Sequence, residues 1–144
     1  MKKVILLSFV FLLSLSLYGQ KTGNLTINVP NANPETKGNL TFFLFDSAEG
    51  FPKEKVEALY VGVIKSFTSE SVTYTFMDIP YGKYALSIFL DKNRNGELDT
   101  GAMGIPKEPV GASNMTKRGK PTFKKCVFDF RKKELTLEVP FITK

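Results

Sequence analysis

The chain has 144 residues, of which 42% are hydrophobic and 24% charged, a length and composition that fit one ordinary globular domain. It contains no histidine and one cysteine, which excludes histidine-based nucleophilic catalysis, His-ligated metal centres and an internal disulfide. The formal net charge of +6 comes from basic residues spread along the sequence, a pattern that favours a solubilising surface over nucleic-acid binding.

Residues 1–19 have the organisation of a secretory signal peptide. Two lysines precede the apolar segment Val4–Leu17, after which the chain turns polar. The apolar segment is shorter than the ~20 residues that a membrane-spanning helix needs. We therefore predict a cleaved signal, with cleavage after Gly19 or after Ser16, and a mature domain over residues 20–144 without a transmembrane segment. Such a protein is exported, either to the periplasm or to the outside of the cell.

Downstream of the signal, apolar and polar residues alternate with the period of two that is typical of half-buried strands. In chain order, this pattern predicts strands over residues 24–29, 40–45, 72–76 and 84–90. Before the third of these, residues 52–58 fit one short helical turn with a proline near its start. Residues 59–65 are rich in strand-forming side chains but have no clear period.

The rest of the chain begins with a long irregular stretch, residues 91–121, and ends with alternating segments at residues 126–130 and 135–141. A structureless stretch of that length is uncommon in a compact domain and is often functional. About seven short strands separated by turn residues predict an all-β fold. We expect a single antiparallel β-sandwich of the transthyretin-like or immunoglobulin-like type.

Two features of these strands predict burial. Residues 40–45 are apolar on both faces, so we expect Phe43 and Phe45 to be covered by a second layer or by the turn at residues 52–58. If they were exposed instead, their rings would form a surface for sugars or for a protein partner. Cys126 is in phase with Phe128 and Phe130, which predicts a buried, unreactive thiol.

The start of the irregular stretch carries the clearest chemical motif. Oxygen-bearing side chains occupy positions 1, 3 and 5, glycine occupies position 6, and a second aspartate occupies position 9. Hard cations such as Ca²⁺ take six to eight oxygen ligands, and alternate side chains in a tight turn can be directed at one point. The spacing predicts a calcium site, in which Glu97 supplies a main-chain oxygen, formed by Asp91, Asn93, Asn95, Glu97 and Asp99.

An alternative without metal stays open for this loop. Position 12 is Ala102, so the bidentate acid of an EF-hand is missing, and Lys92 and Arg94 bring positive charge. Asparagine and aspartate side chains can also accept hydrogen bonds from their own backbone and close a turn unaided. Glu108 is a further candidate ligand from the following loop, and Leu98 is placed to pin the loop to the core.

Four stretches form a recognisable set, namely Asp78–Ala85, Asp91–Asp99, Gly104–Asn114 and Pro121–Phe123. Together they resemble an exported bacterial family known as domain of unknown function 2141, over about residues 24 to 141. The resemblance implies export and a small β-domain, and it implies no activity. Val110 and Ala112 stand where aromatic residues are typical of that family, a departure that would alter a pocket there.

A second, weaker likeness concerns the fold. The rhythm of Pro80, Gly82, Tyr84 and Leu86 is similar to that of transthyretin-like sandwiches, including repeat modules of bacterial surface adhesins. This likeness extends to architecture alone, because one fold hosts many functions.

Two functional hypotheses follow. The first is a non-enzymatic binding or structural module of the cell envelope, stabilised by calcium in the Asp91 loop, with an envelope protein or polysaccharide as its partner and no role for nucleic acid. The second is a carboxylate-dependent hydrolase that acts on an envelope polysaccharide through Asp91, Asp99 or Glu108. Convergence of these carboxylates on a cleft would favour the hydrolase, whereas side chains wrapped around one point would favour the first hypothesis.

Overall fold

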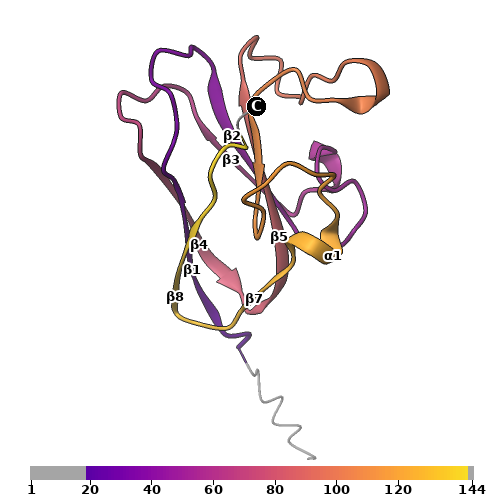
Figure 1. The fold of residues 1–144 in the computed structure, drawn as a ribbon. Helices are drawn as coiled ribbons and strands as arrows, with labels where there is room; N and C mark the ends of the chain where they lie inside the picture. The colour runs from indigo at the N-terminus through magenta and orange to yellow at the C-terminus, as the bar shows by residue number, and fades with distance from the viewer. Residues whose placement is uncertain (1–18, 143–144) are drawn as a thin grey trace, which may run out of the picture.

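The computed structural model describes residues 19–142; the signal peptide predicted for residues 1–19 therefore lies, except for Gly19, outside the described residues. Within them, eight strands form two sheets with very little helix (Figure 1). The prediction of an all-β, sandwich-like fold is confirmed, with eight strands in place of about seven. The strands are β1 Thr22–Val29, β2 Asn39–Phe45, β3 Tyr60–Ile64, β4 Val72–Pro80, β5 Gly82–Asp91, β6 Val110–Ala112, β7 Phe128–Phe130 and β8 Glu134–Glu138.

The smaller sheet has three strands in the order β4-β1-β8. In β1, the predicted alternation is present, because Leu25, Ile27 and Val29 are fully buried and the residues between them are half-buried. β1 pairs with β4 in antiparallel fashion but with β8 in parallel fashion. The β1–β8 pair thus departs from the predicted antiparallel arrangement. The physical reason is connectivity: the chain enters β8 from β7, which belongs to the other sheet, and not through a hairpin from β1.

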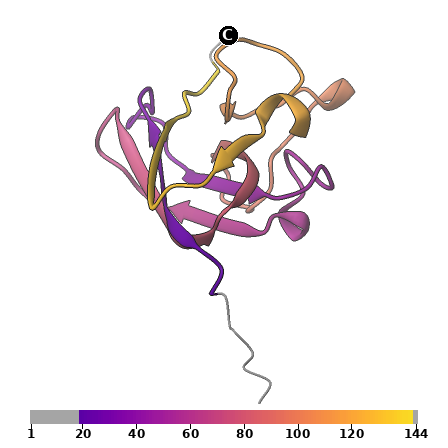
Figure 2. The same ribbon diagram turned by 90° about the horizontal axis from the view of Figure 1, so that it is seen from below.

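The larger sheet has five strands, in the order β3-β2-β5-β6, with β7 also paired to β5. β5 is its central strand, since β2 lies along one edge and β6 and β7 share the other. Seen from below, the chain runs from α1 (Phe123–Cys126) through β7 at the larger sheet and on to β8 at the smaller one (Figure 2). The last residue of β5 is Asp91, so the central strand delivers the predicted motif to the end of the sheet.

The two faces of the larger sheet are covered differently. Its inner face packs on the smaller sheet through a core that includes Phe42, Leu86 and Ile88. On its outer face, Phe43, Phe45 and Phe89 form a second buried cluster, packed against partly buried apolar side chains from irregular segments. The ring centroids of Phe43 and Phe89 lie 5.3 Å apart in an edge-to-face arrangement. The prediction that Phe43 and Phe45 are buried is confirmed.

Short helical turns lie in the irregular segments on that outer side (Figure 1). The turn predicted within residues 52–58 is the 3-10 turn η1, Lys55–Glu57. A second 3-10 turn, η2, spans Ala102–Gly104 inside the long stretch predicted as irregular. Cys126 is buried as predicted, but it ends α1 and is not part of a strand. The alternation with Phe128 and Phe130 misled here because it continues across the helix end at Val127.

The C-terminal segment joins the two sheets. β8 ends at Glu138, earlier than the predicted end at residue 141. Phe141 instead forms two hydrogen bonds with the carboxamide of Asn31, whose Oδ1 accepts from the Phe141 N–H at 2.7 Å and whose Nδ2 donates to the Phe141 carbonyl at 2.9 Å. The next residue, Ile142, donates to the carbonyl of Val110 in β6 at 2.7 Å. The Asn31 side chain thus supplies the hydrogen bonds that a neighbouring strand would otherwise give to Phe141, at the point where the chain crosses between the sheets.

Candidate functional site

Asp91 is placed at the start of the predicted site by the end of the central strand. Its side chain is buried, with 1% of the residue exposed. Its Oδ1 accepts the N–H of Asn95 at 3.1 Å, and its Oδ2 accepts the N–H of Gly96 at 2.8 Å. Gly96 has a φ of 80°, a backbone conformation that glycine adopts without strain. The carboxylate therefore closes the loop onto the strand through charge-assisted hydrogen bonds.

Asn93 and Asn95 each form a turn with their own backbone. The Oδ1 of Asn93 accepts the N–H of Asn95 at 3.1 Å, and the Oδ1 of Asn95 accepts the N–H of Glu97 at 2.9 Å. The two Nδ2 groups both donate to the carboxylate of Asp99, at 2.6 and 3.2 Å. The turns proposed as the alternative to a metal are thus present, and hydrogen bonds connect all five predicted ligand residues within one loop.

Glu108 joins the two ends of this loop. It is buried, with 7% of the residue exposed. Its Oε1 accepts the N–H of Lys92 at 2.7 Å and its Oε2 accepts the N–H of Asp99 at 3.1 Å. The sequence predicted Glu108 as a further metal ligand. In the structure, its carboxylate instead accepts main-chain N–H groups at both ends of the loop.

Calcium remains a prediction for this loop, and the donor set can be compared with what the ion needs. The side-chain donors are all oxygens, as calcium prefers. However, within residues 19–142 no three His, Cys, Asp or Glu side chains gather closely enough to hold a metal ion, so the set depends on the two asparagines. The Nζ of Lys55 lies 4.0 Å from where a Cβ on Gly96 would sit, which adds positive charge beside the loop. A bound cation would have to replace the hydrogen bonds that now reach Asp99.

Of the remaining residues of the motif, one packs against the core and one is exposed to solvent. Leu98 packs against the buried cluster of Phe43, Phe45 and Phe89, as predicted for a residue that pins the loop. Glu97 is exposed, and its backbone N–H takes part in the turn formed by Asn95. The loop is thus anchored from below by an apolar side chain and from both ends by buried carboxylates.

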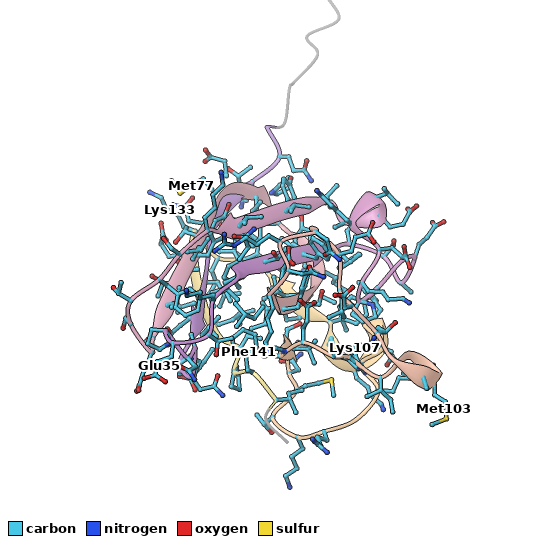
Figure 3. The ribbon with its side chains drawn as sticks, turned by 90° about the horizontal axis from the view of Figure 1, so that it is seen from above. Glu35, Met77, Met103, Lys107, Lys133 and Phe141 are labelled. Atoms are coloured by element: carbon cyan, nitrogen blue, oxygen red, sulfur yellow. The ribbon has the colours of Figure 1, made fainter. Side chains whose placement is uncertain are left out.

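Beyond Asp99, the chain forms an arm over residues 99–109. Gly101 donates to the carbonyl of Ile105 at 2.7 Å, Lys107 donates to that of Asp99 at 2.9 Å, and Thr100 pairs with Pro106. At its base, the N–H of Leu90 donates to the carbonyl of Pro109 at 3.0 Å. Met103, in the turn at the tip, projects away from the body of the molecule (Figure 3) and is 94% exposed.

Beside the arm lies a groove that sequence reasoning did not find. Its volume is about 1000 Å³, and it opens on the outer side of the larger sheet. Five segments line it: residues 51–53, β5 with the Asp91 loop, the arm with β6 that follows directly, residues 118–121 and residues 141–142. Val110 and Ala112 both line it. The one signal in the sequence was therefore their departure from the family pattern at these two positions.

The groove combines an apolar lining with basic side chains. Apolar residues in its lining include Phe51, Phe89, Leu98, Ile105 and Val110. Five basic residues line it as well, namely Lys53, Lys92, Lys107, Arg118 and Lys120. Its acidic residue is Glu108, and both oxygens of that carboxylate accept main-chain N–H groups. The groove is consequently positive in charge.

Two groups with shifted pKa values lie elsewhere and are closed off. Burial raises the pKa of the Cys126 thiol above its ordinary value, so the reactive thiolate is disfavoured. Burial also raises the pKa of Tyr84, whose hydroxyl donates to the carbonyl of Pro80 at 2.7 Å. Neither group lines the groove.

Comparison with known proteins identifies a family. The model of the family described as "uncharacterized protein conserved in bacteria (DUF2141)" matches residues 27–138. The chain belongs to this family. That match includes the last three residues of β1 and all of β2 through β8, and with them the Asp91 loop, the arm and most of the groove of this DUF2141 domain.

No curated protein and no solved structure matches the chain, so the transthyretin-like analogy stays a prediction. A search of residues 19–142 for a helix of sufficient length and apolar character to cross a membrane found none.

Proposed function

We propose that this DUF2141 protein is an exported, non-enzymatic binding module of the bacterial cell envelope, and that the groove is its binding surface. One observation carries the proposal: the carboxylates of the predicted site hold the polypeptide together, while the adjacent groove presents apolar and cationic groups. The first arrangement is structural, and the second is suited to holding a ligand.

The state of the carboxylates is the reason to prefer binding over hydrolysis. Glycoside hydrolysis in most families needs two carboxyl groups on either side of the scissile bond, one of which gives up a proton. Asp91 and Glu108 are buried, and every oxygen of their carboxylates accepts a main-chain N–H. Asp99 accepts both asparagine side chains. These carboxylates are wrapped around a loop and do not face each other across a cleft.

The location in the envelope is supported by the signal-peptide pattern of residues 1–19 and by the positive charge of the groove. Envelope polymers and lipids are commonly anionic, and a cationic surface attracts them through its field. An anionic protein, polysaccharide or lipid component of the envelope is therefore a suitable partner class.

Incubation of the purified mature protein with isolated envelope polysaccharide, followed by assay for reducing ends, separates binding from hydrolysis. We expect no release of reducing ends, from the wild type or from an Asp99→Asn variant. Release by the wild type that is lost in Asp99→Asn would refute the non-enzymatic function. Fractionation of cells that express the full chain tests export, because a processed protein in the periplasm or medium is expected.

Calcium binding completes the proposal as a stabilising element. The side-chain oxygens of Asp91, Asn93, Asn95 and Asp99 and the carbonyl of Glu97 would hold the ion, which would draw the loop together electrostatically. The nearness of both asparagine side chains to Asp99 supports this set, and a bound ion would replace the hydrogen bonds that their Nδ2 groups now donate. Few ligand charges and neighbouring basic side chains place the expected affinity in the weak range of extracellular modules, about 10⁻⁴–10⁻³ M.

A further inference from the structure

We propose that the groove binds a single-chain anionic amphiphile of the long-chain carboxylate class. This inference rests on the proposed function, because it names the ligand class for the same groove. Three features of the groove support it: an apolar lining that would take the chain, cations that would take the head group, and a space of suitable size.

The lining of the groove is suited to an alkyl chain. Phe89 and Leu98 belong to the buried aromatic cluster over the larger sheet, and Val110 continues this surface from β6. On the arm, Ile105 is 58% exposed although it is apolar, and it lines the groove. Phe89 is already buried. Covering the exposed parts of Leu98, Val110 and Ile105 with an alkyl chain removes apolar surface from water and contributes about 25 cal/mol for each Å² buried.

The rim of the groove is suited to a carboxylate. Among residues 19–142, the ion pair present is Arg131 with Asp129, so none of the five basic residues that line the groove is engaged with a carboxylate. Glu108 is occupied by main-chain N–H groups and is buried. An anionic head group would therefore meet cations that have no internal partner, and charge complementarity selects an anion over a neutral or cationic ligand.

The size and shape of the groove favour a small molecule over a polymer. A volume of about 1000 Å³ lies at the upper end of the ~300–1000 Å³ range of ligand pockets. The arm forms one wall, and the C-terminal segment forms another with Phe141 and Ile142. Lys107 of the arm and Phe141 are labelled on the same part of the molecule, distant from Met77 and Lys133 (Figure 3). A single alkyl chain fits such a walled space, whereas a polysaccharide lacks the apolar tail that the lining would cover.

Titration calorimetry of the full mature domain tests this inference with three probes. Dodecanoate, below its micelle concentration, carries both the chain and the anionic head. Dodecyl maltoside carries the chain without charge, and acetate carries the head alone. We expect dodecanoate to bind at least tenfold more tightly than either of the other two.

Matched variants then locate the binding. The groove variant replaces three cations with glutamine, and the control variant replaces one arginine and two lysines far from the groove. The groove set is Lys107→Gln, Arg118→Gln and Lys120→Gln, and the control set is Arg131→Gln, Lys132→Gln and Lys133→Gln. We expect at least tenfold weaker dodecanoate binding in the groove variant and no change in the control. If dodecanoate binding weakens equally in both variants, the effect depends only on the net charge of the protein, and the proposal is overturned.

The apolar part has its own pair of variants, chosen at exposed positions so that folding is preserved. Ile105→Asp places a charge in the groove, whereas Met77→Asp places one on β4, where the side chain is 65% exposed and outside the groove. Weaker dodecanoate binding in Ile105→Asp alone supports the inference. Acetate binding as tight as dodecanoate, association with phosphatidylglycerol vesicles without binding of free dodecanoate, or no binding at all would each overturn it. Those results do not bear on hydrolysis or on export, which the reducing-end assay and the cell fractionation test separately.

Discussion

The Asp91 loop and the groove lie next to each other and share Lys92 and Leu98, but they treat their polar groups in opposite ways. In the loop, the carboxylates of Asp91, Asp99 and Glu108 each accept two hydrogen bonds from the protein itself. In the groove, five basic side chains line an apolar surface without a carboxylate partner among the described residues. The carboxylates of the loop motif are thus paired within the protein. The basic side chains of the groove have no carboxylate partner among the described residues.

The difference shows that a sequence pattern of carboxylates and carboxamides does not by itself establish a binding site. Buried polar groups need partners, and a loop at the end of a central strand exposes several main-chain N–H groups that nearby carboxylates can satisfy. The same residues that suit a cation therefore also suit the backbone. Substitutions in the loop should therefore change stability, whereas substitutions of the groove cations should change ligand binding.

Removal of the Glu108 carboxylate should affect the structural region most. Glu108→Ala leaves the N–H groups of Lys92 and Asp99 without their acceptor, and hydrogen bonds to a charged group contribute ~1.5–3 kcal/mol each. We expect the free energy of unfolding to fall by about 3 kcal/mol in urea denaturation. Glu97→Ala is the matched control, because Glu97 is exposed, and a loss of under ~0.5 kcal/mol is expected there. Similar losses in the two variants would contradict the structural role of Glu108.

The buried cluster around Cys126 should be inaccessible to thiol reagents. Cys126 is fully buried with Ala85 and Ala112, and burial raises the pKa of its thiol. We expect its modification by a disulfide reagent to be about a hundredfold or more slower in the native protein than in urea, because labelling requires opening. If Cys126 reacts as fast in the native protein as in urea, the cluster around it is accessible to solvent.

The same thiol gives a pH dependence with a defined sign. Because the folded pKa is raised above the ordinary value of 9.0, the folded state holds the proton more strongly than the unfolded state. This contribution to stability is fully present below pH 9.0 and is lost as the pH rises through the folded pKa. Comparison of urea midpoints for wild type and Cys126→Ala between pH 8 and pH 10 should show a steeper fall in the wild type.

Calcium should have a moderate effect on the loop. A ligand that binds only the folded state at ten times its Kd stabilises by about 1.4 kcal/mol, which corresponds to a rise in Tm of roughly 3–6 °C in a domain of this size. Magnesium should raise the Tm less, because it sheds water reluctantly. Asp91→Ala should lower the Tm and remove the calcium response, whereas Lys92→Ala should retain the response. Identical melting curves in chelator and in ten millimolar calcium would leave the asparagine turns as the full account of the loop.

The smallest effect is expected far from both regions. Arg131 and Asp129 form an ion pair of 3.6 Å whose side chains are 72% and 60% exposed, and such pairs contribute little. The triple variant Arg131→Gln, Lys132→Gln, Lys133→Gln should therefore change the free energy of unfolding by under ~0.5 kcal/mol, measured in urea. A larger loss would disqualify it as the control for the groove variant.

The sequence predicted the parts of the fold in which side chains report directly on the environment. Alternation located β1, β2, β4 and β5, and the apolar residues on both faces of β2 correctly indicated burial on both sides. It failed at β6, because three residues are too few to define a period. It also failed at Phe141, which keeps the apolar phase of β8 but is held by the side chain of Asn31.

The candidate site was predictable in composition but not in role. Spacing brought Asp91, Asn93, Asn95 and Asp99 together as expected, and Glu108 joined them. That Glu108 would hold main-chain N–H groups at both ends of the loop depends on how the arm folds back, which spacing does not encode. The groove was not predictable, because its lining comes from five segments that only the tertiary structure assembles.

Amide chemical-shift mapping during a dodecanoate titration of the isotope-labelled mature domain distinguishes the two regions in one experiment, since it observes loop and groove together. The division of roles predicts that the largest shift changes fall on groove residues such as Phe89, Ile105 and Val110, with small changes at Asn93 and Asn95. Changes concentrated at Asn93 and Asn95, or on the smaller sheet around Thr26 and Thr75, would contradict it.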